Sequence, residues 1–197
     1  MKIIFSVVMA LGLVPPLFAQ TEQAGGPAKR PVAEKAATPA AAVKGPVKAG
    51  DTVPMFALRK FGGNFIFLKR YCGKNKKEPA VKAVLLDFFA TDCIGCVAQL
   101  PELQSLAAKY APKGLETFLI SIDPTPEEVL PDFLEEKKIT LPVLTDMYRK
   151  TFVNYGFKTV PQTVLIGGDC KAVYVKNQND KGYSAVADSL ETLLKQI

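Results

Sequence analysis

Two of the four cysteines in this chain are separated by two residues, in the order Cys93-Ile94-Gly95-Cys96. Dithiols that exchange disulfides and pairs of metal ligands both use this spacing. Disulfide exchange needs one accessible thiolate to attack and a second thiol to resolve the mixed disulfide. The start of a helix provides both, because its free N–H groups and dipole stabilise the first thiolate while the second cysteine lies in the first turn. We therefore assign Cys93 as the nucleophile and Cys96 as the resolving thiol.

The same spacing also occurs in structural disulfides and in half of a zinc site. A zinc site needs two more ligands at similar spacing, but Cys72 and Cys170 are isolated and the chain contains no histidine. Without histidine, the commonest general base is missing as well. The residues around the pair favour redox chemistry over these two alternatives, with no metal and no cofactor.

The neighbouring segments supply the elements that must position the pair. Residues 81–89 predict a strand covered on both faces, because the run at residues 84–89 within them is apolar apart from the charged Asp87. Residues 96–110 carry leucines at helical spacing. The pair is therefore expected between a buried strand and a helix.

The rest of the folded part alternates between the two kinds of pattern. A β-hairpin is expected at residues 55–58 and 65–68, around a glycine turn. Further extended segments are expected at residues 117–122, 141–144, 163–166 and 172–176. Further helices are expected after Thr125, where Thr125 and Glu128 suggest a capping box and Pro131 a bend or delay, and at residues 147–155 and 184–197. This order predicts an α/β fold with helices on both faces of a sheet.

The N-terminal fifty residues differ from the rest in composition. Met1-Lys2 and the apolar run 3–19 resemble a secretory signal cut near Ala19. A retained membrane anchor is the alternative, but the run is short for a spanning helix and contains two prolines. Residues 20–50 are rich in Ala, Pro, Lys and Gly, which predicts a flexible linker. Residues 51–197 form the expected domain, exported to an oxidising compartment, the periplasm.

The net charge of +6 lies mostly outside that domain, because residues 51–197 contain 19 basic and 17 acidic residues. Nucleic-acid binding is therefore not expected. The lysines of the linker could contact an anionic membrane surface. We expect a monomer that is soluble or loosely associated with the membrane.

Three segments resemble the thioredoxin superfamily: VLLDFFATDCIGC at residues 84–96, LPEL at 100–103 and YGFKTVPQT at 155–163. The exported start and the Pro-Glu-Leu sequence are most similar to the TlpA/ResA type of periplasmic thiol-disulfide oxidoreductase. The resemblance covers residues 51–197 in order. It implies a thioredoxin-like fold with a central mixed sheet and an N-terminal β-hairpin.

The resemblance also implies roles for individual residues. Pro161 would be a cis-proline facing the dithiol, with the Val160 backbone free to pair with a substrate strand beside Ile94 and Gly95. An ordinary proline at the start of a strand is the alternative. Asp87 would be the buried carboxylate that exchanges a proton with Cys96. Pro101 matches the proline within the family's active-site helix, a structural role.

The family resemblance implies a protein that reduces disulfides in exported proteins, for example apocytochrome c, and is recharged by a membrane thiol reductant. Two departures from the family pattern bear on the direction of electron flow. Asp92 stands where the family usually has Trp, and Ile94-Gly95 replaces a pair that usually contains proline. Both changes favour a reductant, and a disulfide oxidant or isomerase is the alternative.

In such a fold Cys72 and Cys170 lie at the end of the sheet opposite the dithiol. They could form a structural disulfide or remain two free thiols, and an oxidising compartment favours the disulfide.

Three other functions are compatible with parts of this pattern. A peroxiredoxin shares much of the fold, but Thr91 is only two residues before Cys93, where the peroxidatic cysteine needs a threonine three residues before it. A copper-delivery protein would normally use a histidine, which is absent. A module kept only for interaction would not need intact cysteines.

The carboxylate of Asp92, next to the nucleophile, should oppose the helix dipole and disfavour the Cys93 thiolate. Asp92→Asn and Asp92→Trp are therefore expected to lower the pKa of the Cys93 thiol, measured by the pH dependence of alkylation. An unchanged titration in both variants would refute this electrostatic argument.

Overall fold

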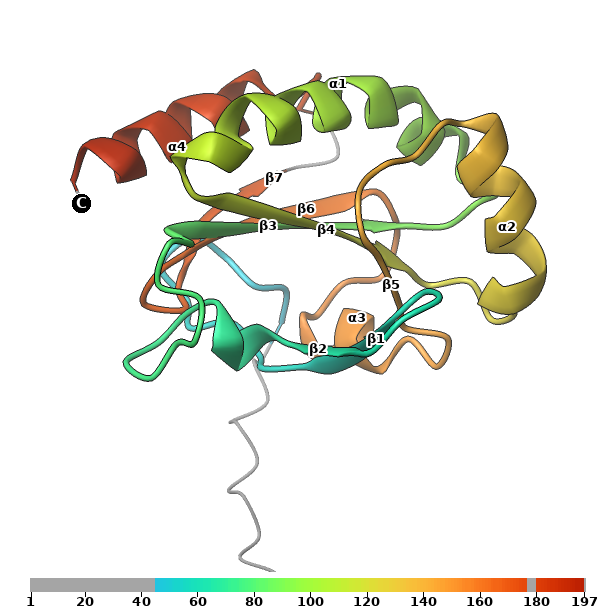
Figure 1. Cartoon of the computed structure of the whole chain (residues 1–197), viewed down its shortest axis with the longest axis horizontal. Helices are drawn as coiled ribbons and strands as arrows, with labels where there is room; N and C mark the ends of the chain where they lie inside the picture. The colour runs from blue at the N-terminus through green and yellow to red at the C-terminus, as the bar shows by residue number, and fades with distance from the viewer. Residues whose placement is uncertain (1–44, 177–179, 197) are drawn as a thin grey trace, which may run out of the picture. The chain divides into compact units, whose positions relative to one another are not determined.

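The computed structural model describes residues 45–176 and 180–196, which form a seven-stranded mixed sheet with helices on both faces. The strand order is β2-β1-β5-β4-β3-β6-β7 (Figure 1). The strands are β1 Ala57–Lys60, β2 Phe65–Phe67, β3 Ala83–Phe89, β4 Leu115–Ser121, β5 Val143–Thr145, β6 Gln162–Gly167 and β7 Ala172–Lys176. The helices are α1 Ile94–Tyr110, α2 Pro126–Glu136, α3 Lys150–Asn154 and α4 Ser184–Lys195, with short 3₁₀ turns η1 Leu68–Arg70 and η2 Ala111–Lys113.

The three parallel strands, β3, β4 and β5, lie in the middle of the sheet. The hairpin β1–β2 is added on one side through an antiparallel pairing of β1 with β5. On the other side β6 and β7 follow, each antiparallel to its neighbour. The α/β class, the mixed sheet and the N-terminal hairpin expected from the sequence are confirmed.

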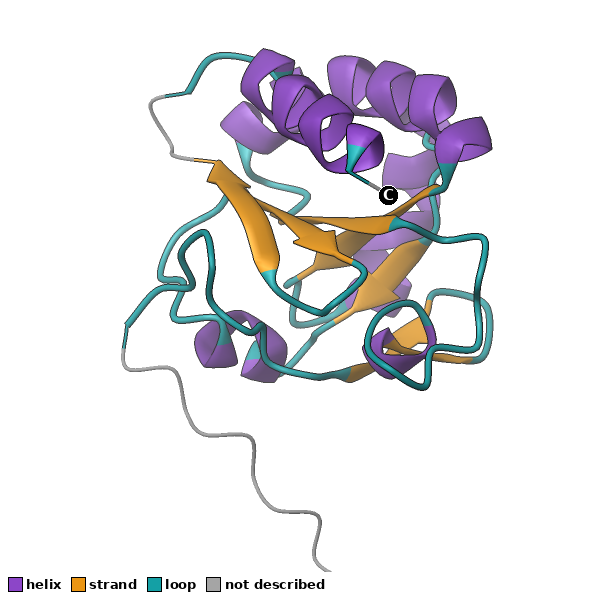
Figure 2. Ribbon diagram, turned by 90° about the vertical axis from the view of Figure 1, so that its left-hand side faces the viewer, coloured by secondary structure: helices purple, strands orange, loops and turns teal. Residues whose placement is uncertain are grey.

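β3 is buried at every position, which explains its nearly continuous apolar sequence. Because side chains alternate along a strand, Val84, Leu86 and Phe88 enter one core layer and Leu85 and Phe89 the other. α1, α2 and α4 contribute to the layer that contains Leu85, while α3 and the hairpin contribute to the layer that contains Val84 (Figure 2). Asp87 lies between Leu85 and Phe89 on the same face of the strand, so it faces the layer under α1.

Two details of α2 differ from expectation. The side chain of Thr125 makes no capping hydrogen bond, although its carbonyl accepts from the N–H groups of Glu128 and Val129. Pro131 lies inside the helix and neither delays nor ends it. The hydrogen bond that a proline cannot donate would have reached Glu127 in the exposed first turn, where water can satisfy the carbonyl.

The segment expected as a linker contributes to the domain core. Val47 is 2% exposed, and its N–H donates to the carbonyl of Tyr155 at 2.9 Å. The expected signal segment, residues 1–19, and most of the expected linker lie outside the described residues. Among the residues that the structure describes, no helix has the length and apolar character needed to cross a membrane.

A disulfide joins Cys72, in the loop after η1, to Cys170, in the turn between β6 and β7. The two cysteines are 98 residues apart in sequence, and both are buried. The N–H of Gly73 also donates to the carbonyl of Gly168 at 2.8 Å. The disulfide therefore fixes the long loop that precedes β3 to the turn between β6 and β7.

Removing this disulfide by Cys72→Ala/Cys170→Ala is expected to lower the free energy of unfolding by roughly 3 to 5 kcal/mol, because it closes a long loop in the unfolded chain. Denaturant unfolding of the oxidised protein measures the loss. Cys93→Ala/Cys96→Ala is the matched control and should lose less, since that pair is separated by only 3 residues. Equal losses in the two variants would contradict the loop-closure argument.

Candidate active site

Cys93 is the N-cap residue of α1, and Cys96 lies in the first turn of that helix. The Cys96 N–H donates to the Sγ atom of Cys93 at 3.1 Å, and the two sulfurs are bonded at 2.06 Å. Cys93 is partly exposed, whereas Cys96 is 1% exposed. One sulfur is thus open to an incoming thiol or disulfide, and the other can be reached only through its partner.

The loop before β6 lies against the turn that contains the cysteines. The Val160–Pro161 peptide bond is cis. A Cβ atom added to Gly95 would lie 3.9 Å from Cδ of Pro161, so the Gly95 backbone is adjacent to the proline ring. Ile94 is 87% exposed. Gly95 and Pro161 are thus neighbours, and the exposed Ile94 lies between Gly95 and the partly exposed Cys93 in the chain.

Asp87 is a carboxylic acid in the middle of the buried strand β3, where it is only 2% exposed. Its Oδ1 accepts hydrogen bonds from the Thr163 hydroxyl at 2.6 Å and from the Tyr183 hydroxyl at 3.0 Å. Burial raises the pKa of Asp87 to about 6, although both hydrogen bonds and the positive charge of Lys176 lower it. Asp87 can therefore accept and release a proton near neutral pH.

The sheet register explains how these groups meet. Asp87 on β3 is paired with Thr163 on β6, and Thr163 is paired with Lys176 on β7. The three side chains form a polar row on the face that α1 and α4 cover. Lys176 is 4% exposed, and its Nζ donates to the carbonyl of Asp180 at 2.9 Å. Nζ also lies 5.5 Å from the centre of the Tyr183 ring.

Tyr183 is held over Asp87 by the helix that carries the cysteines. Its N–H donates to Oε1 of Glu102 on α1 at 2.7 Å. Gly182, with φ +66°, permits this close approach, since a Cβ atom there would lie 2.7 Å from the same oxygen. Burial, followed by the charge of Asp87, raises the pKa of Tyr183, so the hydroxyl remains a donor.

A second buried carboxylate fixes the backbone that leads into the cysteine turn. Asp123 accepts hydrogen bonds from the Thr91 N–H at 3.1 Å and from the Thr91 hydroxyl at 2.9 Å. The Ser121 hydroxyl donates to its other oxygen at 2.7 Å. The end of β4 therefore holds the chain two residues before Cys93.

The structure gathers most of the sequence-derived site residues at one end of β3. Cys93, Ile94, Gly95 and the Val160–Pro161 bond lie together at the surface, with Asp87 in the core layer below α1. Cys72 and Cys170 form their own disulfide at the other end of the sheet.

The sequence pattern did not single out the second buried carboxylate, Asp123, or the residues around the two carboxylates: Ser121, Thr163, Lys176 and Tyr183. Thr163 had a usable signal, because it is the second residue after Pro161 and begins the strand expected at residues 163–166. The other residues had no local signal. Within residues 45–176 and 180–196, no group of three or more His, Cys, Asp or Glu residues is placed to hold a metal ion.

Comparison with known proteins agrees with this geometry. The chain is 28% identical over 152 residues to the thiol-disulfide oxidoreductase ResA of Bacillus thuringiensis subsp. konkukian, covering 77% of this chain and 79% of that protein. A crystal structure from Chlorobium tepidum, proposed to be a thiol:disulfide interchange protein DsbE, matches with a TM-score of 0.63 at 25% identity, covering 75% of this chain and 99% of that one. The peroxidoxin BcpB of Mycobacterium tuberculosis shares the fold, with a TM-score of 0.61 at 24% identity over 77% of this chain and 98% of that one.

The fold and the Cys93–Cys96 pair thus define a thioredoxin-like thiol-disulfide oxidoreductase of the ResA/DsbE type. The chain belongs to the AhpC/TSA family, whose model matches residues 49–175.

Asp87 should make stability depend on pH, because its pKa is raised in the folded protein. The stability linked to this group is present at low pH and is lost as the pH rises through about 6, where the buried carboxyl must ionise. Asp87→Asn is therefore expected to raise the free energy of unfolding of the oxidised protein by about 3 kcal/mol at pH 8 and by less than about 1 kcal/mol at pH 4. Denaturant unfolding at the two pH values measures the difference.

Asp92→Asn removes an exposed carboxylate close to the same site and is the matched control. If Asp87→Asn raises the free energy of unfolding by the same amount at both pH values, the buried carboxyl does not titrate in this range.

Proposed function

We propose that this oxidoreductase works outside the cytoplasm as a reductant of disulfides in exported proteins. The observation that carries the proposal is the unequal environment of the two sulfurs. Cys93 is partly exposed at a helix N-terminus, and Cys96 is buried in the core layer that Asp87 faces. Dithiol exchange requires this division between an attacking and a resolving thiol.

The proposed reaction begins with the reduced dithiol. The Cys93 thiolate attacks one sulfur of the substrate disulfide, forming a mixed disulfide and releasing the other substrate sulfur as a thiolate. Asp87 accepts the proton of the Cys96 thiol, and the resulting thiolate attacks Cys93. The mixed disulfide breaks, the second substrate thiolate leaves, and the Cys93–Cys96 disulfide remains. The two electrons gained by the substrate come from the enzyme dithiol.

The direction of electron flow follows from how weakly the Cys93 thiolate is stabilised. The Cys96 N–H and the helix dipole favour the thiolate. The chain has no histidine to add a further donor, and the Asp92 carboxylate lies next to the nucleophile. A dithiol whose thiolate is poorly stabilised passes its electrons on more readily, which supports a reductant.

The threonine near the nucleophile supports dithiol exchange over peroxide reduction. A peroxidatic site needs a threonine hydroxyl directed at the reacting sulfur and oxygen atoms. The Thr91 hydroxyl instead donates to Asp123 at 2.9 Å. In this contact the Thr91 side chain stabilises the loop between β3 and Cys93.

The substrates would be exported proteins that carry a disulfide in an extended segment, for example apocytochrome c before haem attachment. Such a segment would pair with the Val160 backbone beside the cis-Pro161 bond and contact exposed Ile94 and the Gly95 backbone. A membrane thiol reductant would return the pair to the dithiol state. The name of the ResA relative, a thiol-disulfide oxidoreductase, agrees with action on disulfides.

The reduction potential of the Cys93–Cys96 pair tests the direction. The protein is equilibrated in thiol-disulfide buffers, quenched with an alkylating reagent, and each cysteine pair is read separately by peptide mass spectrometry. A value at or below about −230 mV is expected for a reductant. Reading the pairs separately avoids mutating the Cys72–Cys170 disulfide, which serves as an internal reference.

A potential above about −180 mV would contradict the proposal and indicate an oxidant or isomerase. Consumption of hydrogen peroxide by the Cys93 thiol, without activity on a protein disulfide, would assign the chain to the peroxidase function instead.

A further inference from the structure

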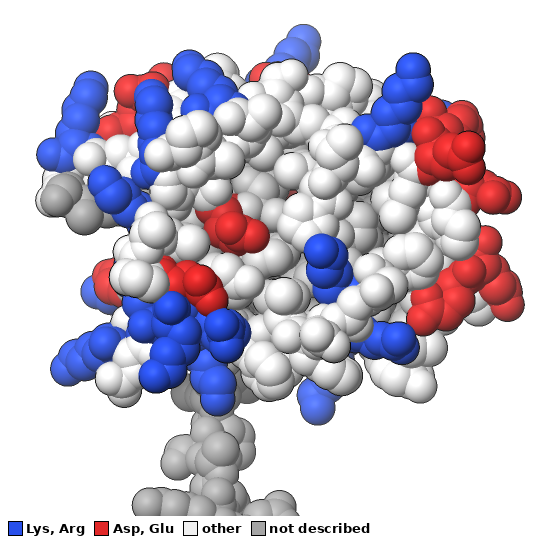
Figure 3. Space-filling model, viewed as in Figure 1, with Lys and Arg blue, Asp and Glu red and all other residues white. Residues whose placement is uncertain are grey.

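Five of the 25 Lys and Arg residues lie in one nine-residue segment without any acidic residue, residues 69–77. Residues 51–197 contain 19 basic and 17 acidic residues, so 14 basic and 17 acidic residues remain when this segment is set aside. Figure 3 shows Lys and Arg side chains gathered at the lower left, over the loop that follows β2 in the same view of Figure 1. The near-neutral domain therefore concentrates five basic residues in one short segment, and its other residues are slightly acidic in sum.

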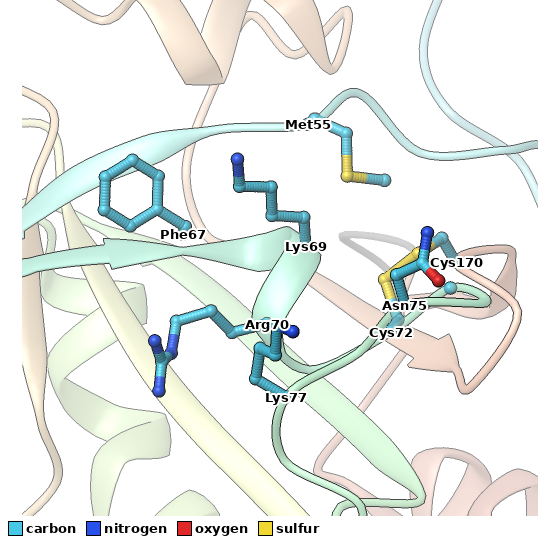
Figure 4. Close-up of a pocket in the computed structure, with 9 residues that line it drawn as sticks. Met55, Phe67, Lys69, Arg70, Cys72, Asn75, Lys77 and Cys170 are labelled. Carbon is cyan, nitrogen blue, oxygen red and sulfur yellow. A yellow bond between two sulfur atoms is a disulfide. The ribbon is translucent and has the colours of Figure 1, made fainter.

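Exposed apolar side chains adjoin the basic segment. Met55 and Phe67 are 42% and 39% exposed, and they line an open depression of about 720 Å³ together with Lys69 and Lys77 (Figure 4). The ring of Phe65, 58% exposed, lies 6.5 Å from that of Phe67. Nζ of Lys69 lies 5.6 Å from the centre of the Phe67 ring. We call this surface the basic-aromatic face; its residues are Met55, Phe65, Phe67, Lys69, Lys74 and Lys77.

The loop that carries the face is fixed to the domain. The Cys72–Cys170 disulfide lies beside the depression, and the N–H of Lys77 donates to the carbonyl of Arg70 at 2.7 Å. Arg70 is paired with Glu78 at 2.8 Å, and Nζ of Lys76 donates to the carbonyl of Val81 at 2.6 Å. The side chains of Lys74 and Lys77 are exposed and form no hydrogen bond or ion pair with any described residue. Their charges are therefore directed to solvent.

We propose that the basic-aromatic face docks on an anionic bilayer surface. Lysines on flexible stems suit a diffuse anionic surface, whereas the bidentate geometry of arginine suits a single fixed anion, and the one arginine here is already paired with Glu78. Met55, Phe65 and Phe67 supply the apolar groups that enter the boundary between headgroups and acyl chains. An acidic protein would use the charges but would leave these apolar groups without a defined partner.

Docking in this way leaves the active site accessible. Ala83, at the start of β3, is paired with Gly167 near the Cys72–Cys170 disulfide, while Cys93 follows the other end of the strand. The strand separates the two regions by about 20 Å. In Figure 1, β3 runs from the side of the basic loop toward the start of α1. The proposal does not depend on the direction of electron flow at Cys93–Cys96.

The chain contains no Trp, so a single Trp can report contact at a chosen point. In the exported chain with its linker, Phe67→Trp is mixed with phosphatidylglycerol/phosphatidylcholine vesicles or with pure phosphatidylcholine vesicles. A blue shift of the emission and quenching by brominated lipid are expected with the anionic vesicles only. Ile94→Trp, beside Cys93, is the matched reporter and should show neither change. Because linker lysines could also bind the vesicles, this pair of reporters identifies which face makes the contact.

The charge contribution is tested by sedimentation with the same vesicles. Lys74→Glu/Lys77→Glu is expected to weaken binding at least about 25-fold, since each cation near an anionic surface contributes roughly fivefold. Lys138→Glu/Lys150→Glu makes the same change in net charge at two exposed positions elsewhere on the surface and should weaken binding much less. Reduction of a soluble protein disulfide should be unchanged in both variants, because none of these lysines belongs to the active site.

Several outcomes would overturn the proposal. These are equal binding to both kinds of vesicle, equal losses in the two double variants, or a spectral shift in Ile94→Trp but not in Phe67→Trp. The face would instead be assigned to a protein partner if the vesicles are not bound and an acidic polypeptide protects Lys74 and Lys77 from chemical acetylation.

Discussion

The structure depends on one costly constraint, the burial of the Asp87 carboxylate in the middle of a strand that is otherwise apolar. An ionisable group 2% exposed must find hydrogen-bond donors or remain protonated. Asp87 has two donors, the hydroxyl groups of Thr163 and Tyr183. Burial still raises its pKa to about 6, so it also remains protonated below that pH. The strands and the helix around Asp87 hold those donors in place.

Each donor requires a long-range element of the fold. Thr163 reaches Asp87 only because β6 pairs with β3 in antiparallel register, and Lys176 extends the row because β7 pairs with β6. Tyr183 reaches the same oxygen because Glu102 on α1 accepts its N–H and because Gly182 has no side chain. The helix that presents the cysteines and the sheet below it are therefore joined through one polar cluster. A change in the packing of α1 would alter the environment of Asp87 as well as the position of Cys96.

The sequence predicted local features and missed the long-range polar contacts. The strand at 81–89, the helix after the cysteines and the hairpin follow from periodicity and glycine turns, which depend on neighbouring residues. Asp87 could be singled out because a charge interrupts an apolar run. Tyr183 and Asp123 could not be, because their partners are 96 and 32 residues away and nothing in their own segments marks them. Thr125 fitted a capping pattern, yet its hydroxyl makes no cap, since the pattern constrains residue types and leaves the rotamer open.

Two carboxylates flank the dithiol, and they act by different means. Asp92 is exposed, so its charge is screened by water, and its effect is confined to the adjacent Cys93 sulfur. Asp87 is buried on the face of β3 that packs against the core layer of Cys96, where charges are screened less than in water, and it is charged mainly above a pH of about 6. Above that pH both carboxylates disfavour a thiolate at the site, while the Cys96 N–H and the helix dipole favour one at Cys93 alone. Repulsion between these carboxylates and a thiolate favours oxidation of the dithiol, because the disulfide that forms carries no charge. In the proposed reaction, the polar cluster supplies a proton acceptor for the resolving thiol and favours the oxidised state of the pair.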